Sequence, residues 1–191
     1  MDHYLKKEIT YSFGKRELRF DVGNTLFSTF QIDRGTDMLL RAIDYSNPKT
    51  ILDIGCGYGP IGIALASKYP QAQVTMVDRD LLAVRYTEHN IAKNKIDNAR
   101  ALGSIGIEQV GDETFDLIVS NIPAKIGDEA ITREFVLDPY GHLTPGGELW
   151  VVVVSGLNRL VPKIGRQHQL SMKEIKKKSG HTVYRVRKPG L

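Results

Sequence analysis

The stretch Lys49-Thr-Ile-Leu-Asp-Ile-Gly-Cys-Gly-Tyr-Gly-Pro60 decides the fold of this chain. Its first half is an apolar run, which predicts a short buried strand over residues 51–54. Its second half carries three alternate glycines, which form a turn without side chains where a ligand can approach the backbone. Helical spacing of apolar residues resumes at Ile61, so we expect the turn to present free N–H groups at a helix N-terminus.

The spacing of the glycines separates two kinds of nucleotide-binding turn. In the dinucleotide-binding pattern Gly-x-Gly-x-x-Gly the third glycine would fall at Pro60, whereas this chain has Gly59, which disfavours a nicotinamide enzyme. The pattern Asp-x-Gly-x-Gly-x-Gly resembles motif I of class I S-adenosylmethionine-dependent methyltransferases. That resemblance implies S-adenosylmethionine as the cofactor, bound by Asp53, Gly55, Gly57 and Gly59.

Length and composition are those of a soluble globular protein. The 191 residues suit one domain, residues 1–191, with residues 1–30 as an N-terminal hairpin extension. The longest apolar run, Leu149–Val154, is too short to cross a membrane, and the N-terminus lacks the apolar core of a signal peptide. We therefore expect a cytoplasmic protein with no membrane partner. A single cysteine, Cys56, excludes an internal disulfide.

Positive charge gathers toward the C-terminal end. Between Asn158 and Lys188 there are ten lysines and arginines against one acid, Glu174, while the other residues carry sixteen against twenty-one. Such segregation favours one basic face for a polyanion, with nucleic acid as the leading candidate. The alternative is a solvated lysine-rich edge without a partner.

Strand and helix patterns alternate along the chain. Residues 8–13 and 17–22 predict a β-hairpin, and a helix follows that Thr36 or Asp33 caps and Asn47-Pro48 closes. The other expected strands are 51–54, 74–78, 99–102, 115–120, 148–154, 170–177 and 183–187, and the other expected helices are 61–69, 81–92, 130–137 and 157–164. The order predicts an α/β fold with a doubly wound, mostly parallel seven-stranded sheet that ends in an antiparallel hairpin.

Two positions after the glycine turn are candidates for holding a nucleoside. Asp78 ends the second strand of the sheet, about 20 residues after the turn, where an acid accepts hydrogen bonds from ribose hydroxyls, and Arg79 follows it. Adenine is expected after the third strand, at Ser104 and Ile105. Many methyltransferases have an acid there, so this chain departs from the pattern, and we expect backbone groups near Ser104 and packing by Ile105 to hold the ring.

The segment Asn121-Ile-Pro-Ala124, at the end of the fourth strand, resembles motif IV (Asn-Pro-Pro-aromatic) of methyltransferases that modify nitrogen. An amino group conjugated to a ring needs two acceptors for its hydrogens before its lone pair can face a methyl group. Asn121 and the carbonyl of Ile122 are the expected acceptors, and Pro123 favours an extended residue before it. In this chain Ile122 stands in place of the first proline and Ala124 in place of the aromatic residue. The motif therefore does not decide which molecule is methylated.

Together with three upstream pieces, these motifs resemble the methyltransferase small family, whose best-known members methylate guanine N2 in small-subunit ribosomal RNA. The pieces are Phe27-Ser28, Asp33-Arg-Gly-Thr36 and Leu39-Leu40. The resemblance spans roughly residues 20–155 and implies that Thr36 lies close to the cofactor, together with Asn121. It implies N-methylation of guanine in ribosomal RNA without a metal, and the charge distribution then favours RNA on the basic C-terminal edge.

Two other functions remain open on the residues alone. One is methylation of a protein glutamine of the release factor type, which uses a similar motif IV. The other is a catalytically silent RNA-binding module that keeps the fold and the basic edge. The sequence does not indicate an oligomeric state.

Overall fold

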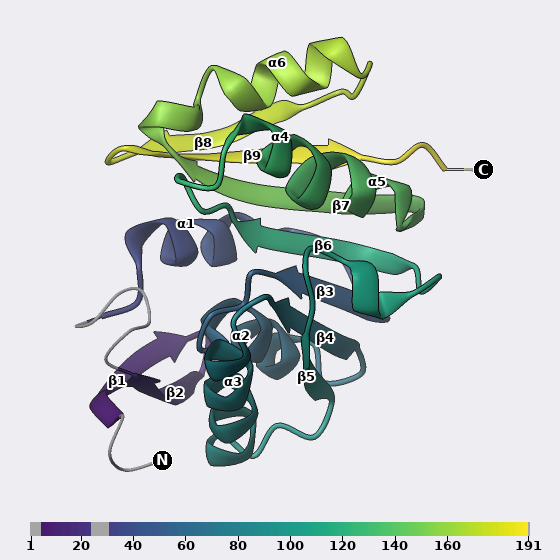
Figure 1. The fold of residues 1–191 in the computed structure, drawn as a ribbon. Helices are drawn as coiled ribbons and strands as arrows, with labels where there is room; N and C mark the ends of the chain where they lie inside the picture. The colour runs from purple at the N-terminus through teal and green to yellow at the C-terminus, as the bar shows by residue number, and fades with distance from the viewer. Residues whose placement is uncertain (1–4, 24–30, 191) are drawn as a thin grey trace.

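The computed structural model describes residues 5–23 and 31–190. Its centre is a seven-stranded sheet in the order β5-β4-β3-β6-β7-β9-β8, which Figure 1 shows from β8 near the top to β5 near the bottom. The strands are β3 (Thr50–Ile54), β4 (Gln73–Asp78), β5 (Ala99–Gly103), β6 (Phe115–Asn121), β7 (Leu143–Val154), β8 (Lys173–Lys178) and β9 (His181–Arg187). β3 to β7 pair in parallel, and β9 and β8 continue antiparallel. The predicted doubly wound α/β fold is therefore confirmed.

The strand order reverses at β3. The chain runs outward from β3 to β4 and β5, then returns to place β6 on the other side of β3. Ligands of open parallel sheets bind outside the carboxyl ends of the strands at such a switch point. The glycine turn after β3 and the motif that ends β6 therefore share one edge of the sheet.

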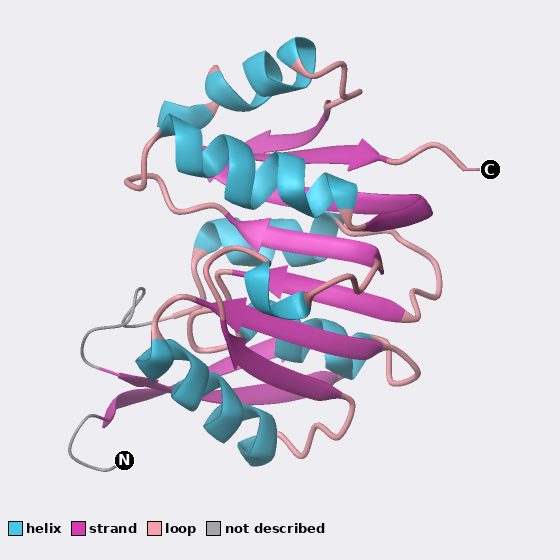
Figure 2. Ribbon diagram, turned by 45° about the vertical axis from the view of Figure 1, so that its right-hand side comes forward, coloured by secondary structure: helices cyan, strands magenta, loops and turns pink. Residues whose placement is uncertain are grey.

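Helices cover both faces of the sheet, as Figure 2 shows. Helices α1 (Arg34–Ala42), α2 (Pro60–Lys68) and α3 (Leu81–Lys93) share one apolar core. The other core contains η2 (Glu108–Val110), α4 (Asp128–Thr132), the π-helical turn η3 (Arg133–Leu137), η4 (Ser155–Leu157) and α6 (Leu160–Gln167), and α5 (Asp138–Gly141) continues η3. Adjacent residues of β3 point to opposite cores, Ile51 to the first and Leu52 to the second, because side chains alternate along a strand.

The N-terminal hairpin, β1 (Leu5–Phe13) and β2 (Arg16–Gly23), forms a separate two-stranded sheet. It is joined to α3 by polar contacts: Asp21 binds Lys93 Nζ and His89 Nε2, each at 2.6 Å, and the amide of Asn90 donates to the Asp21 carbonyl. The apolar side of the hairpin belongs to the core of α1, α2 and α3. The predicted hairpin is confirmed, and its packing supports α3, the helix that follows β4.

Several predicted boundaries differ from the structure. Helix α1 ends at Ala42, well before Asn47-Pro48. The helical stretch expected over 130–137 runs from Asp128 to Gly141 through the π-helical turn. Strand β7 begins at Leu143 instead of at the predicted residue 148, because residues 143–147 form a bulge inside the ladder with β6.

Phe27-Ser28 lies outside the described residues. No helix of the described part is both long enough and apolar enough to span a bilayer.

Candidate active site

The glycine turn between β3 and α2 needs glycine for its backbone. Gly55, Gly57 and Gly59 have φ angles of +72°, +60° and +91°, which L-residues with a side chain seldom adopt. A Cβ at Gly59 would lie 2.9 Å from Ile63 Cδ1, whereas a Cβ at Gly57 would meet nothing within 4 Å. Gly59 therefore allows close packing, and the turn is open beside Gly57, where a ligand can lie against the backbone.

The expectation that the turn offers free N–H groups is wrong for four of its residues. Gly55 and Cys56 donate to the carbonyl of Val77 at 2.8 and 3.0 Å. Gly59 donates to the carbonyl of Cys56 at 2.9 Å, and Gly57 donates to Asp78 Oδ2 at 2.8 Å. Strand β4 satisfies three of these donors because it lies beside β3, so a ligand at this turn would meet open glycine backbone and neighbouring carboxylates instead of these four N–H groups.

Asp78 ends β4 and is half-buried. Besides accepting from Gly57, its carboxylate accepts from the N–H of Asp80 through Oδ1 at 2.9 Å. Each carboxylate oxygen has a second lone pair, so both oxygens can still accept from a ligand hydroxyl. The following residue, Arg79, is exposed to solvent.

Asp53 lies beneath the turn and is fully buried. Its Oδ2 accepts from the N–H of Gly62 at 2.8 Å, while its buried Oδ1 has no hydrogen-bond partner in the described structure. Burial, followed by the charge of Asp78, raises the pKa of Asp53 to about 7. A buried carboxylate with a single partner is stabilised as an anion by a nearby positive charge, so this arrangement fits a cationic ligand such as S-adenosylmethionine.

The positions expected to hold adenine behave differently from one another. The Ser104 N–H donates to the Asp78 carbonyl at 2.9 Å, and its hydroxyl accepts from the N–H of Gln109 at 3.1 Å, so Ser104 shapes the loop after β5. Ile105 is 50% exposed. Leu81, at the start of α3, is 66% exposed and lies over Gly103, where a Cβ would be 2.5 Å from Leu81 Cδ2.

Ile105 and Leu81 therefore present exposed apolar surface after the neighbouring strands β5 and β4. Sequence reasoning missed Leu81. The available signal was an apolar residue directly after Asp80, the helix cap, at the end of the strand that carries Asp78.

Asn121, at the end of β6, is held by two side chains from the start of α1. Its Nδ2 donates to Asp33 Oδ2 at 2.9 Å and to Thr36 Oγ1 at 3.1 Å. A carboxylate can only accept, so this contact fixes the orientation of the amide and leaves its Oδ1 available as an acceptor. Thr36, predicted to lie close to the cofactor, is buried against Asn121. The sequence indicated Asp33 as a helix cap and as part of a family motif, and gave no sign of its contact with Asn121.

The rest of the segment divides into a buried and an exposed part. Ile122 donates its N–H to the Val152 carbonyl at 3.0 Å, and its side chain lies in the core. Pro123 and Ala124 are exposed. Ile122, which stands in place of the motif's first proline, therefore anchors the loop. Ala124 offers no aromatic surface on which a flat target could stack.

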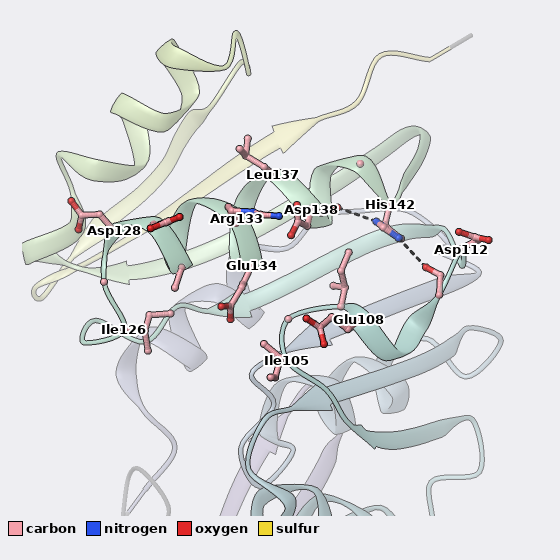
Figure 3. Close-up of a pocket in the computed structure, with 17 residues that line it drawn as sticks. Ile105, Glu108, Asp112, Ile126, Asp128, Arg133, Glu134, Leu137, Asp138 and His142 are labelled. Carbon is pink, nitrogen blue, oxygen red and sulfur yellow. Dashed lines mark hydrogen bonds between the residues drawn. The ribbon is translucent and has the colours of Figure 1, made fainter.

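An acidic groove of about 1180 Å³ lies between the loop after β5 and the helical stretch of α4 and α5. Figure 3 shows Ile105 and Glu108 facing Ile126 and Glu134 across it. Of the predicted site residues the groove includes only Ile105. Its charged lining is mainly acidic: Glu108, Asp112, Asp128, Glu129, Glu134 and Asp138, with Arg133. A polyanion such as RNA is therefore repelled from this side.

The predicted basic edge exists but is smaller than the sequence suggested. The four lysines of β8, the outermost strand, are exposed: Lys173, Lys176, Lys177 and Lys178. Arg185 instead faces Glu148 at 3.5 Å and the ring of Trp150, and Arg187 Nε donates to the Gly146 carbonyl. Lys188 Nζ donates to the Leu143 carbonyl at 2.7 Å. Arg185 and Lys188 act within the fold, whereas Arg187 keeps an exposed side chain, so the part of this edge that faces solvent comprises the β8 lysines and Arg187.

The fold is that of the class I methyltransferases. A solved structure from T. thermophilus, a 16S rRNA N2 G1207 methyltransferase in complex with AdoMet and guanosine, superposes with a TM-score of 0.80 at 23% identity, over 96% of this chain and 51% of that one. The methyltransferase small domain family matches residues 17–185, and the chain belongs to this family, as its motifs indicated. Clusters of three or more His, Cys, Asp or Glu side chains suited to a metal do not occur within residues 5–23 and 31–190.

Two curated relatives differ in how much of their length this chain matches. Ribosomal RNA small subunit methyltransferase C of Pasteurella multocida (strain Pm70) is 35% identical over 165 residues, 85% of this chain and 49% of that protein. YbxB of Bacillus subtilis (strain 168), an uncharacterized protein, is 29% identical over 94% of this chain and 91% of its own length. The chain thus spans about half the length of the ribosomal RNA methyltransferase that it matches.

Proposed function

We propose that this chain is an S-adenosylmethionine-dependent N-methyltransferase that acts on the exocyclic amino group of guanine in ribosomal RNA. The observation that carries the proposal is the orientation of Asn121, whose Nδ2 is held by Asp33 and Thr36 while its Oδ1 remains an acceptor. The named relatives that act on small-subunit ribosomal RNA support the choice of substrate.

The cofactor site combines the features found along the edge of the sheet. The open turn at Gly57 would lie against the methionine part, and Asp78 would accept from the ribose hydroxyls. Ile105 and Leu81 would pack on the adenine ring, and Asp53 would face the positive charge of the cofactor from beneath. Gly55 and Gly59 give the turn its shape, and Arg79 and Ser104 flank the nucleoside.

Catalysis rests on positioning. The cofactor supplies a methyl group already activated by its sulfonium, so the chain has to orient the nitrogen and exclude water. As the nitrogen becomes positive, its hydrogens bind acceptors more strongly, and Asn121 Oδ1 and the Ile122 carbonyl would accept them. The Ile122 N–H bond to Val152 and the following Pro123 restrain that carbonyl.

RNA would approach over the lysines of β8, away from the acidic groove. Four exposed lysines on one strand can neutralise successive phosphates, and the binding should then weaken as salt rises. A base within folded RNA has to be turned out before it reaches Asn121. The named relatives come from bacteria, whose ribosomes lie in the cytoplasm, so we place this chain in the cytoplasm.

The exposed Ala124 favours one alternative, a silent RNA-binding module, because no aromatic residue at this position stacks on a base. A protein glutamine as target is the second alternative.

Transfer of tritiated methyl groups decides between these functions. Parent protein and Asn121→Ala would be incubated with tritiated S-adenosylmethionine and, separately, small ribosomal subunits, deproteinised ribosomal RNA and total protein from a deletion strain. We expect label in RNA, recovered as N2-methylguanosine after digestion, with the parent only. Label in protein would establish the second alternative, and RNA binding without label in any fraction would establish the silent module.

A further inference from the structure

Asp33 has more contacts than a helix cap requires. Its Oδ2 accepts from the Thr36 N–H at 3.1 Å, which caps α1, and also from Asn121 Nδ2 at 2.9 Å. One side chain thus ties the start of α1 to the end of β6, 88 residues further along the chain. The Thr36 hydroxyl accepts the same amide at 3.1 Å, so both Nδ2 hydrogens of Asn121 have an acceptor.

The surroundings hold the Asp33 carboxylate in this place. A Cβ at Gly35 would lie 2.9 Å from Asp33 Oδ2 and 2.8 Å from the Cδ2 of His181, so only glycine leaves room for both side chains. Burial, and after it the Asp33 charge, raises the pKa of Tyr58 in the glycine turn. The field of the carboxylate therefore reaches Tyr58 as well as Asn121.

The chain of hydrogen bonds from Asp33 through the Asn121 amide to the target nitrogen has a chemical consequence. A carboxylate that accepts from an amide N–H pushes electron density from the nitrogen toward the amide oxygen, because linked hydrogen bonds polarise and strengthen one another. Asn121 Oδ1 is then a stronger acceptor for the hydrogens of a nitrogen that becomes positive. The negative charge of Asp33 also stabilises that positive charge through the amide.

We propose, on the basis of the methyltransferase function above, that Asp33 is a positioning residue that orients and polarises Asn121, with Thr36 as its partner. Asp33 contacts Asn121, not the reacting nitrogen. Its loss should therefore lower kcat and leave cofactor binding nearly unchanged.

Asp33→Ser is the variant that tests this. A serine still caps α1, since Ser and Asp are both good caps, but its shorter side chain does not reach Asn121. Breaking a hydrogen bond to a charged group typically costs a factor of roughly 10 to 100, so we expect kcat to fall by about that much with the cofactor Kd within a few-fold. Thr36→Val should give a smaller drop, and Thr36→Ser should recover it.

A double-mutant cycle separates positioning from general stability. Asp33→Ser should cost nothing further on the Asn121→Ala background, because its effect passes through the amide. Asp37→Asn is the matched control. Asp37 lies in the same turn of α1, but its carboxylate binds Tyr11 and Arg41 instead of Asn121, so its replacement should leave kcat unchanged. An equal loss from Asp33→Ser on both backgrounds would mean that Asp33 only stabilises the fold.

A second readout needs no substrate. The side-chain amide resonances of Asn121, assigned by their absence in Asn121→Ala, should shift and exchange faster with water in Asp33→Ser. If these resonances do not move, the inference is overturned whatever the parent's activity. If the parent transfers no methyl group to any substrate fraction, the proposed function fails, and a role for Asp33 in catalysis fails with it.

Discussion

Replacing Asp53 by asparagine should make the protein without cofactor more stable at neutral pH while weakening its binding of S-adenosylmethionine. The new amide keeps an oxygen for the Gly62 N–H, and the substitution removes a buried charge whose second oxygen has no partner. The folded pKa of Asp53, about 7, lies above its ordinary value of 3.8. The folded state therefore binds more protons between these values, and the contribution of Asp53 to stability is lost as pH rises through about 7.

The size of the effect follows from the shift. A shift of about three units corresponds to about 4 kcal/mol at most, at roughly 1.4 kcal/mol per unit. The free energy of unfolding of Asp53→Asn minus that of the parent should therefore grow by up to about 4 kcal/mol from about pH 4 to about pH 8.

Urea unfolding at several pH values measures this difference, in which contributions common to both proteins cancel. Asp97→Asn, which removes an exposed carboxylate, controls for the loss of one negative charge. Saturating cofactor should stabilise the parent more than the variant, because its positive charge compensates Asp53. A difference that stays constant with pH would refute the reasoning, as would equal stabilisation of both proteins by the cofactor.

Four other predictions concern Asp78, Asn121, Ala124 and the β8 lysines. Asp78→Ala should weaken cofactor binding by about 1–3 kcal/mol in calorimetry, because it strands the Gly57 N–H and removes the acceptor for ribose; unchanged affinity would place the ribose elsewhere. Asn121→Ala should reduce methyl transfer roughly 100- to 1000-fold with cofactor affinity within a few-fold, and full activity would remove Asn121 from the mechanism. Ala124→Phe should raise activity or leave it unchanged if the target is a flat base. Replacing the four β8 lysines by Gln should reduce the slope of RNA affinity against salt concentration by the equivalent of up to about four phosphate contacts. Neutralising the exposed Lys15 and Arg16 is the control and should leave the slope unchanged. If the slope also stays unchanged in the β8 variant, β8 is a solvated edge without an RNA partner.

The elements of the fold were predictable because their patterns are local. Apolar runs, helical spacing and glycine turns repeat over a few residues, and they placed every strand of the sheet within a few positions except the start of β7. There, pairing with β6 carries residues 143–147 into the ladder although their composition is that of a turn. The π-helical turn before α5 has no comparable local signal in the sequence.

The site was predictable as a set of motifs but not as a set of contacts. Sequence alone placed the glycine turn, Asp78 and Asn121 at the ends of neighbouring strands, because parallel strands bring their carboxyl ends to one edge. Only the tertiary structure decided that Asp33 holds Asn121, that Asp78 takes the Gly57 N–H, and that Arg185 and Lys188 serve the fold. Such contacts join residues far apart in the chain, and which of them form depends on how the helices pack on the sheet, which no local pattern encodes.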